Sequence, residues 1–132
     1  LLGLETSHPA RPMLMGALAA AAKSLQRFQR PDGHWSWAIV MPETHLDSSA
    51  TSFCGYALAR AVKGGLLDAD NSAMINRALH AIRTSTRPNG VVDHSSGECR
   101  GLSDYNHEYR PEVWLQGTAL AFSRVWEAPG PQ

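Results

Sequence analysis

The sequence lacks an excess of charge of either sign. Twelve basic residues balance twelve acidic ones among its 132 positions, and no long run of like charge occurs. Proteins that bind nucleic acids or membrane surfaces usually display a basic patch or stripe. The composition therefore argues against a nucleic acid or a membrane as the partner, and it favours a small, neutral or mildly charged molecule.

Long hydrophobic runs and metal-binding spacings are missing too. The longest apolar stretch, at 17–22, is mostly alanine and is far shorter than the roughly 20 residues of a membrane-spanning helix. Two cysteines, Cys54 and Cys99, are too few for a disulfide framework, and neither they nor the histidines have the spacing of metal ligands. The sequence thus predicts no membrane span and no metal site.

The N-terminus has neither an initiator Met nor the basic-then-apolar pattern of a signal peptide. Its opening residues, Leu1-Leu2-Gly3-Leu4, look like the end of an earlier apolar helix. We therefore expect this chain to be the C-terminal piece of a longer protein, and we expect that protein to act in the cytoplasm.

An internal repeat organises the chain. Arg-Pro-Asp-Gly at 30–33 recurs 57 residues later as Arg-Pro-Asn-Gly at 87–90. Proline disfavours helical backbone in the residue before it, and glycine accepts a positive φ, so each copy is expected to end a helix. A repeat of this length is typical of stacked helical hairpins.

Apolar residues at helical spacing predict four helices, at about 12–29, 48–63, 70–84 and 111–126. Asp47 offers a cap before the second helix, Gly64 can end it, and Pro111 is placed just inside the start of the fourth. The stripe that we expect the second helix to bury consists of Ala50, Phe53, Cys54, Ala57, Leu58, Ala61 and Val62.

The predicted fold class is all-α, with antiparallel helical-hairpin repeats that form a single domain over 1–132. The first hairpin covers about 12–63 and the second about 70–126. Strand-type alternation is scarce. Repeated hairpins bury their faces against neighbours, so two hairpins alone should leave apolar surface at both ends. We expect this surface to be covered by a second copy of the chain or by the N-terminal half of the same protein.

Each long loop joins the first helix of a hairpin to the second, so both loops should emerge on the same side. Aromatic faces interleaved with polar groups suit an oligosaccharide, whose C–H bonds stack on rings and whose hydroxyls need hydrogen bonds. Trp35 and Trp37 alternate, so we expect one to point inward and the other outward. The predicted substrate-binding residues are His34, Trp35, Trp37, His45, His94, Arg100, Tyr105, Tyr109 and Trp114.

The catalytic group stays unassigned from the residues. Glycosidases usually need a carboxylic acid with a raised pKa. The loop carboxylates are Asp47, Asp93, Glu98 and Asp104. Asp47 is expected to cap a helix, and none of the others has the surroundings of a general acid.

Several segments, taken in order, resemble unsaturated rhamnogalacturonyl hydrolases, glycoside hydrolase family 105. They include Arg-Pro-Asp-Gly-His-Trp at 30–35 and His-Leu-Asp-Ser-Ser-Ala-Thr-Ser-Phe at 45–53. The related unsaturated glucuronyl hydrolases of family 88 share the Asp-Ser-Ser-Ala at 47–50. The likeness covers about 8–68 and continues more loosely through 117–122.

The resemblance implies a six-hairpin (α/α)6 toroid that acts on oligosaccharides bearing a 4,5-unsaturated uronic acid, as in pectin degradation. In such enzymes an aspartate protonates the double bond and activates water, and no metal or organic cofactor is implied. The family's catalytic aspartates lie in earlier hairpins, so this chain is expected to lack them. Trp35 is implied to form a stacking wall for the sugar.

Trp37 departs from the family pattern, in which a polar or basic side chain often lies near that position. A toroid glycosidase acting on saturated uronides is therefore a possible variant. Arg100 or Arg110 could supply the missing cation, because guanidinium pairs with carboxylate through two hydrogen bonds.

Two alternatives remain open. Gln-Arg-Pro-Asp-Gly-His-Trp at 29–35 also resembles the Gln…Gly-x-Trp repeat of triterpene cyclases, in which Trp35 would be structural. The acidic DxDD signature of the cyclases is absent, however, and the second copy has Val91-Val92 instead of tryptophan. The other alternative is a non-catalytic helical-repeat module that self-associates through exposed hairpin faces.

Overall fold

Four helices dominate the computed structural model, which describes residues 1–98 and 108–128. They are α1 (Arg11–Phe28), α2 (Ser48–Lys63), α3 (Ser72–Thr84) and α4 (Val113–Glu127). The remaining elements are the short strands β1 (Trp35–Ser36), β2 (Leu46–Asp47), β3 (Ser95–Ser96) and β4 (Tyr109–Arg110), and the 3₁₀ turn η1 (Ala69–Asn71). The all-α class is confirmed, and none of the described helices is long and apolar enough to cross a membrane.

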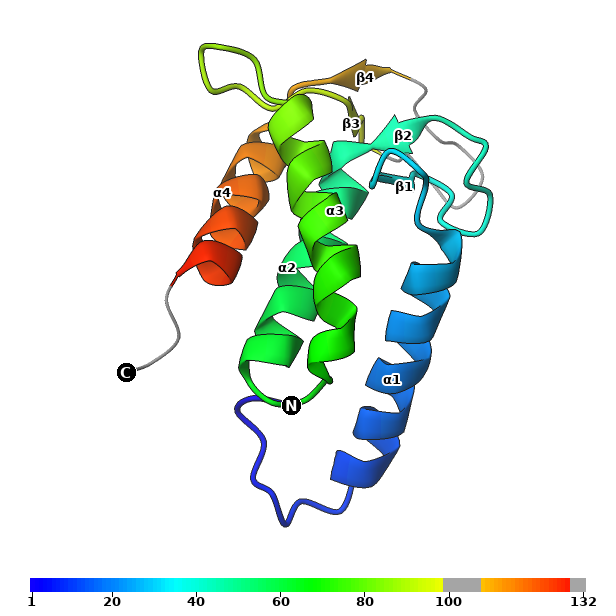
Figure 1. Ribbon diagram of the computed structural model, residues 1–132, viewed down its shortest axis with the longest axis vertical. Coiled ribbons are helices and arrows are strands. Elements are labelled where there is room, and N and C mark those ends of the chain that lie inside the picture. Colours follow the sequence, from blue (N-terminus) through cyan, green and yellow to red (C-terminus); the bar gives the residue numbers. More distant parts are fainter. Residues whose placement is uncertain (99–107, 129–132) are drawn as a thin grey trace.

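Successive helices run in opposite directions, with α1 and α3 leading towards the loops and α2 and α4 leading away from them (Figure 1). Within the loops, β1 pairs antiparallel with β2, and β3 pairs antiparallel with β4. Both strand pairs lie at the same end of the molecule (Figure 1). The prediction that the two long loops emerge on one side is therefore confirmed.

The two copies of the repeated turn have the same hydrogen bonds. In the first copy, the amide of Gly33 donates to the carbonyl of Arg30 over 2.9 Å; in the second, the amide of Gly90 donates to Arg87 over 2.8 Å. The glycines have φ values of +89° and +85°, a backbone region that favours glycine. The internal repeat read from the sequence thus corresponds to a repeated turn at the end of α1 and of α3.

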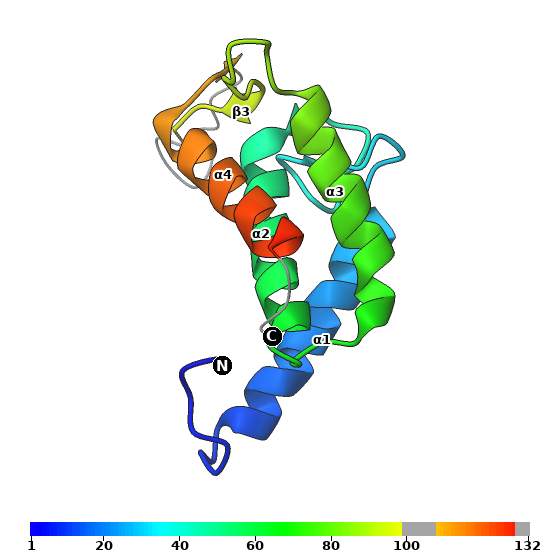
Figure 2. The same ribbon diagram turned by 60° about the vertical axis from the view of Figure 1, so that its left-hand side comes forward.

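The core lies where α2 packs against α4 and α3 (Figure 2). The face of α2 turned to α4 carries small residues, and Ser52 and Thr118 join the two helices through hydroxyls 2.8 Å apart. At Gly55 a Cβ would lie only 2.4 Å from the ring of Phe122, whose side chain is fully buried. Glycine at this position therefore sets the spacing between α2 and α4.

The apolar stripe predicted for α2 is wrong in part, because Phe53 is 50% exposed and Ala57 is exposed as well. The buried face instead includes Ser48, Ser52 and Gly55. The reason is the close parallel approach of α4, which favours small side chains over a phenyl ring. On α3 the predicted helix is confirmed, and its buried residues include Met74, Ala78, Ala81 and Ile82.

Apolar surface is left open at both edges of the described structure. On α1, Met13 is 70% exposed, and only Ala22 is buried. On α4, Val113 is 85% and Leu120 72% exposed. These are the unpartnered faces expected of two hairpins that lack their neighbours. The helix start at Val113 also corrects one detail, because Pro111 precedes α4 and Glu112 occupies its N-cap position.

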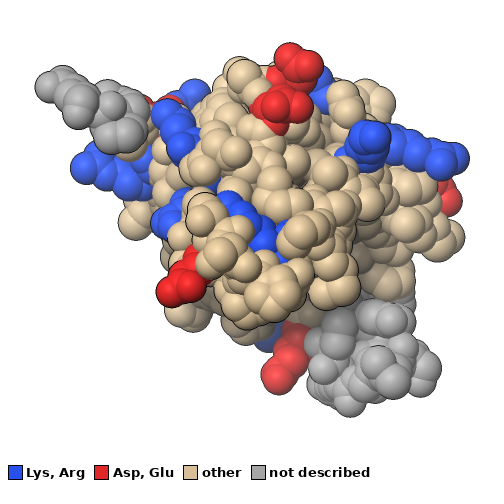
Figure 3. Space-filling view, turned by 90° about the horizontal axis from the view of Figure 1, so that it is seen from below, with Lys and Arg blue, Asp and Glu red and all other residues tan. Residues whose placement is uncertain are grey.

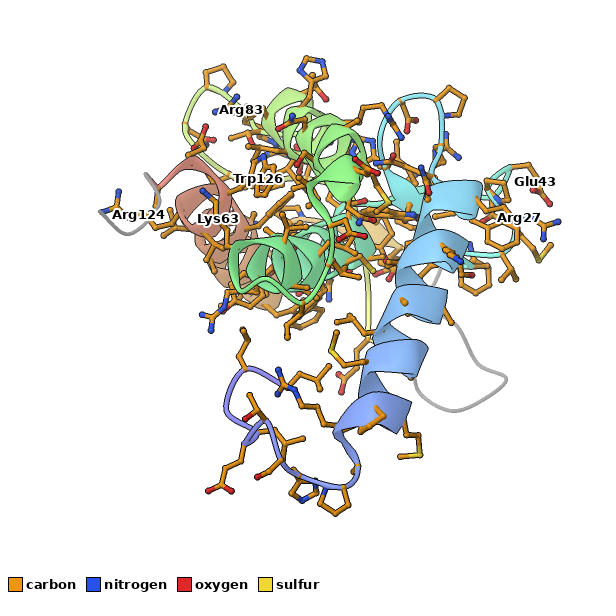
Figure 4. All side chains as sticks on the ribbon, turned by 60° about the horizontal axis from the view of Figure 1, so that its bottom comes forward. Arg27, Glu43, Lys63, Arg83, Arg124 and Trp126 are labelled. Atoms are coloured by element: carbon orange, nitrogen blue, oxygen red, sulfur yellow. The ribbon has the colours of Figure 1, made fainter. Side chains whose placement is uncertain are left out.

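At the end opposite the loops, polar contacts join α4 to α2 and α3. The indole of Trp126 donates to Asn76 over 2.6 Å, and the Lys63 ammonium lies 5.6 Å from the centroid of the Trp126 ring. Figure 4 shows the side chains of Lys63 and Trp126 next to each other. Figure 3 shows this end with Lys and Arg side chains scattered over it, without a continuous basic patch.

Gly55→Ala is expected to destabilise the chain by about 1–3 kcal/mol, because the added methyl group must push against the ring of Phe122. Gly16→Ala is the matched control, since a Cβ at Gly16 meets nothing within 4 Å. There, alanine should stabilise α1 by about 0.5–1 kcal/mol through its higher helix propensity. Urea denaturation measures both changes, and equal effects at the two positions would contradict this account of the α2–α4 contact.

Candidate functional site

Asp47 ties the two loops together at the N-terminus of α2. Its Oδ1 accepts hydrogen bonds from the amide and hydroxyl of Ser49 at 2.8 and 2.7 Å. Its Oδ2 accepts one from the hydroxyl of Ser96, in the second loop, at 2.8 Å. The amide of Ser48 adds a further tie by donating to the carbonyl of His94 over 2.9 Å. The predicted cap is thus confirmed, and it also joins the loops.

Three aromatic rings from separate segments lie close together near these hydrogen bonds. The imidazole of His45 stacks on the phenol of Tyr109, with centroids 3.6 Å apart and planes inclined by 20°. The imidazole of His94 lies 6.2 Å from that of His45, centroid to centroid. Both histidines are exposed, and Tyr109 is half-buried. The structure therefore brings together three of the predicted substrate-binding residues on an accessible surface.

His94 has a φ of +67°, in the left-handed region that few residues other than glycine adopt. Its carbonyl oxygen is held by Ser48, which fixes this conformation. This conformation could not be predicted, because neither glycine nor asparagine occupies the position. Such backbone conformations tend to occur at functional sites.

Trp35 takes the inward position of the two loop tryptophans. Its side chain is fully buried, its indole N–H donates to the carbonyl of Leu25 over 2.8 Å, and its amide donates to the hydroxyl of Thr51 over 2.9 Å. No face of the ring is open to a sugar, so the implied role as a stacking wall does not fit this position. Trp37 is half-buried and lies further out.

His34, another predicted substrate-binding residue, also lies inside the structure and not on its surface. It is 4% exposed, with Nε2 2.9 Å from the hydroxyl of Ser85 and Nδ1 3.4 Å from a carboxylate oxygen of Asp32. Burial lowers the pKa of His34 below its ordinary value, and the charge of Asp32 opposes this only in part. The position links the first loop to the end of α3, which does not fit direct binding of a sugar.

Trp114, in the first turn of α4, is 44% exposed and remains a candidate for stacking on a sugar. Arg110 is paired, because its Nε donates to Glu112 over 2.6 Å, and this interaction raises its pKa. Arg100 and Tyr105, the other predicted substrate-binding residues, lie outside the described residues.

The model of Glycosyl Hydrolase Family 88 matches residues 1–124 of this sequence. The chain belongs to this family. No curated protein matches the chain.

Solved structures extend the likeness to the fold. A possible member of the GH105 family from Salmonella enterica is similar with a TM-score of 0.84 and 22% identity, over 95% of this chain and 34% of that structure. A glycosyl hydrolase of family 88 from Bacteroides vulgatus is similar with a TM-score of 0.75 and 21% identity, over 92% of this chain and 37% of that structure.

A family 105 glycoside hydrolase from C. acetobutylicum gives a TM-score of 0.79 at 17% identity, over 94% of this chain and 40% of that structure. The chain thus spans little more than a third of the structures it matches. The resemblance to families 88 and 105 and the predicted fold class are confirmed: the chain corresponds to part of an (α/α)6 toroid of this type. Family membership sets aside the alternative of a terpene-cyclase-like toroid.

The carboxylates of this family 88 chain do not provide an obvious acid among the described residues. Asp47 is 4% exposed and surrounded by donors, and Asp93 is ion-paired with Arg87. Glu98 is exposed, and Asp104 lies outside the described residues. Burial, with a contribution from Asp47, raises the pKa of the Cys54 thiol to about 11, so Cys54 stays protonated and is not a nucleophile at neutral pH.

The buried imidazole of His34 should make the stability of the chain sensitive to acid. Its pKa is lower in the folded chain than the ordinary value of 6.5, so the unfolded chain takes up the proton more readily. The free energy of unfolding is therefore expected to be unaffected by this group at pH 8 and to fall as the pH drops below 6.5. Urea denaturation between pH 8 and pH 5 measures this slope.

His34→Gln should flatten the slope, because the amide can still hydrogen-bond to Ser85 but does not titrate. His80→Gln, at an exposed position on α3, should leave the slope as in the wild type. Identical slopes in the wild type and His34→Gln would show that His34 does not carry this acid sensitivity.

Proposed function

We propose that this chain supplies part of the substrate-binding rim of a glycoside hydrolase acting on oligosaccharides that contain uronic acid, either unsaturated or saturated. The observation that carries the proposal is the convergence of His45, His94 and Tyr109 from two loops. Membership of family 88 supports a sugar as the ligand. From the resemblance to unsaturated rhamnogalacturonyl hydrolases we propose pectin-derived fragments in the cytoplasm as the substrates.

The rim offers both kinds of contact that an oligosaccharide needs. Trp114 presents an accessible indole for stacking, and Tyr109 adds a phenol face and a hydroxyl. Burial and the nearby Asp47 raise the pKa of Tyr109, so its hydroxyl keeps its proton and can donate to a sugar oxygen. The imidazoles supply further polar edges at the same end of the molecule.

The catalytic acid is proposed to come from the rest of the protein. Asp47 and Asp93 are already held by donors or an ion pair, so neither carboxylate is free to serve as the general acid. Because the chain spans about 34% of the first matched structure, further hairpins would complete the active site. No cofactor is part of this proposal.

Binding can be tested by titrating the chain with unsaturated digalacturonate while following tryptophan fluorescence. Trp114→Ala should weaken binding about tenfold, which is roughly 1.4 kcal/mol, because the stacking surface is lost. Val113→Ala is the matched control, since this side chain is adjacent and 85% exposed. No saturable change with the wild type, or equal losses in both variants, would count against the rim.

A self-associating module without catalytic function is the second candidate. The open apolar side chains of Met13, Val113 and Leu120 favour it. Under this alternative, light scattering should show a dimer or larger assembly at micromolar concentrations. Leu120→Lys should reduce the assembled fraction, whereas a wild-type chain that stays monomeric speaks against the module.

A further inference from the structure

A groove lies between α3 and α4, beside the second copy of the repeated turn. It holds a cavity of about 400 Å³. Most of its lining is apolar, with Leu79 and Ile82 from α3 and Ala119 and Leu120 from α4. Leu120 is 72% exposed, so nothing in the described part of the chain covers this side of the groove. The groove therefore offers apolar surface to a partner.

The first hairpin shows what fills the equivalent groove. There α3 passes over the turn at 30–33, so closely that a Cβ on Gly33 would lie 2.4 Å from the backbone oxygen of Arg77. The side-chain amide of Gln29 donates to the carbonyl of Met74 over 3.0 Å, and its oxygen accepts from Arg77. The first helix of the next hairpin is thus seated directly against the turn.

The second copy of the turn lacks such a helix. Gly90 corresponds to Gly33 in the repeat, and no atom of residues 1–98 and 108–128 lies within 4 Å of a Cβ added there. The turn itself is the same, with the same hydrogen bond and a similar positive φ. The internal repeat therefore indicates that a helix equivalent to α3 belongs in the groove between α3 and α4.

α1 has an unpartnered face that matches this role. Ala78 and Ala81, fully buried on α3, correspond 57 positions earlier to Ala21 and Ser24 of α1. Both of these residues are exposed, and so is Ala17, one turn before Ala21. Small side chains allow two helices to pack closely. Because α1 and α4 form opposite edges of the molecule (Figure 1), this face of one chain can meet the groove of another.

We propose that α1 of a second copy of this chain docks into the groove between α3 and α4, head to tail, and that three copies close a ring of six hairpins. The inference is independent of the proposed sugar-binding rim. Each chain has two hairpins and follows the fold of the matched GH105 structure over 34% of its length, with a TM-score of 0.84. A head-to-tail interface repeats one rotation between successive copies, and with the curvature of a six-hairpin toroid three copies return to the start.

Sedimentation equilibrium of the 132-residue chain at micromolar concentrations should give three times the mass of one chain. Leu120→Lys, in the groove, and Ala21→Lys, on the α1 face, should each give a monomer, because docking would bury an unpaired ammonium group. Ala19→Lys is the matched control. Ala19 is exposed on the opposite side of α1, so this variant should keep the mass of the wild type.

A mixture of the two blocked variants tests the direction of docking. The Leu120→Lys chain keeps its α1 face, and the Ala21→Lys chain keeps its groove. Together they should form a dimer with one copy of each and nothing larger. An interface in which both copies use the same surface would give no dimer in the mixture. Circular dichroism of each variant shows whether its helices are intact.

A wild-type chain that stays monomeric, or an assembly that neither Leu120→Lys nor Ala21→Lys reduces, overturns the proposal. So does a mixture of the two variants that stays monomeric while both are folded. Sugar binding is measured separately, so these outcomes leave the proposed rim unaffected. The mass of the wild type needs no substitution and decides the question even where a variant does not fold.

Discussion

The hydrogen bonds of Asp47 are the interaction on which the candidate site depends. A carboxylate that caps a helix normally satisfies only the backbone of the next turn. Here one oxygen caps α2 through Ser49, and the other holds Ser96 of the second loop. Because the neighbouring amide of Ser48 also binds the carbonyl of His94, both loops are fixed to one helix end. The rings of the rim are therefore positioned by buried contacts beneath them.

The helices and repeated turns could be predicted because they depend on neighbouring residues. Proline, glycine and apolar spacing fix the end of each helix locally. The repeat at 30–33 and 87–90 indicates that the first helix of each hairpin ends in the same type of turn. The buried face of α2 could not be predicted in this way. It is decided by Thr118, 66 residues away from Ser52, and by the ring of Phe122 against Gly55. The spacing of apolar residues along the sequence does not predict such contacts, because they involve small residues.

In the candidate site, too, neighbouring residues predict some features, and contacts between distant segments decide the others. Alternation predicted that one of Trp35 and Trp37 points inward, but not which one, because the choice depends on the pairing of Trp35 with Asp47 and on the hydroxyl of Thr51. Its place in the loop predicts a substrate-binding role for His34, yet the hydroxyl of Ser85, directly after α3, holds it inside. Histidines that face solvent and histidines that join elements have the same sequence signature. Only the contacts between distant segments distinguish them.

The parts of the chain that need neighbours are not the parts that form the rim. Apolar surface gains about 25 cal/mol per Å² when it leaves water, so the open faces of α1 and α4 favour further hairpins. Those faces include Met13 and Leu120. By contrast, the hydrogen bonds that hold the two loops under the rim lie within this chain. Loss of neighbours should therefore loosen the edges, α1 above all, before it displaces His45 from Tyr109.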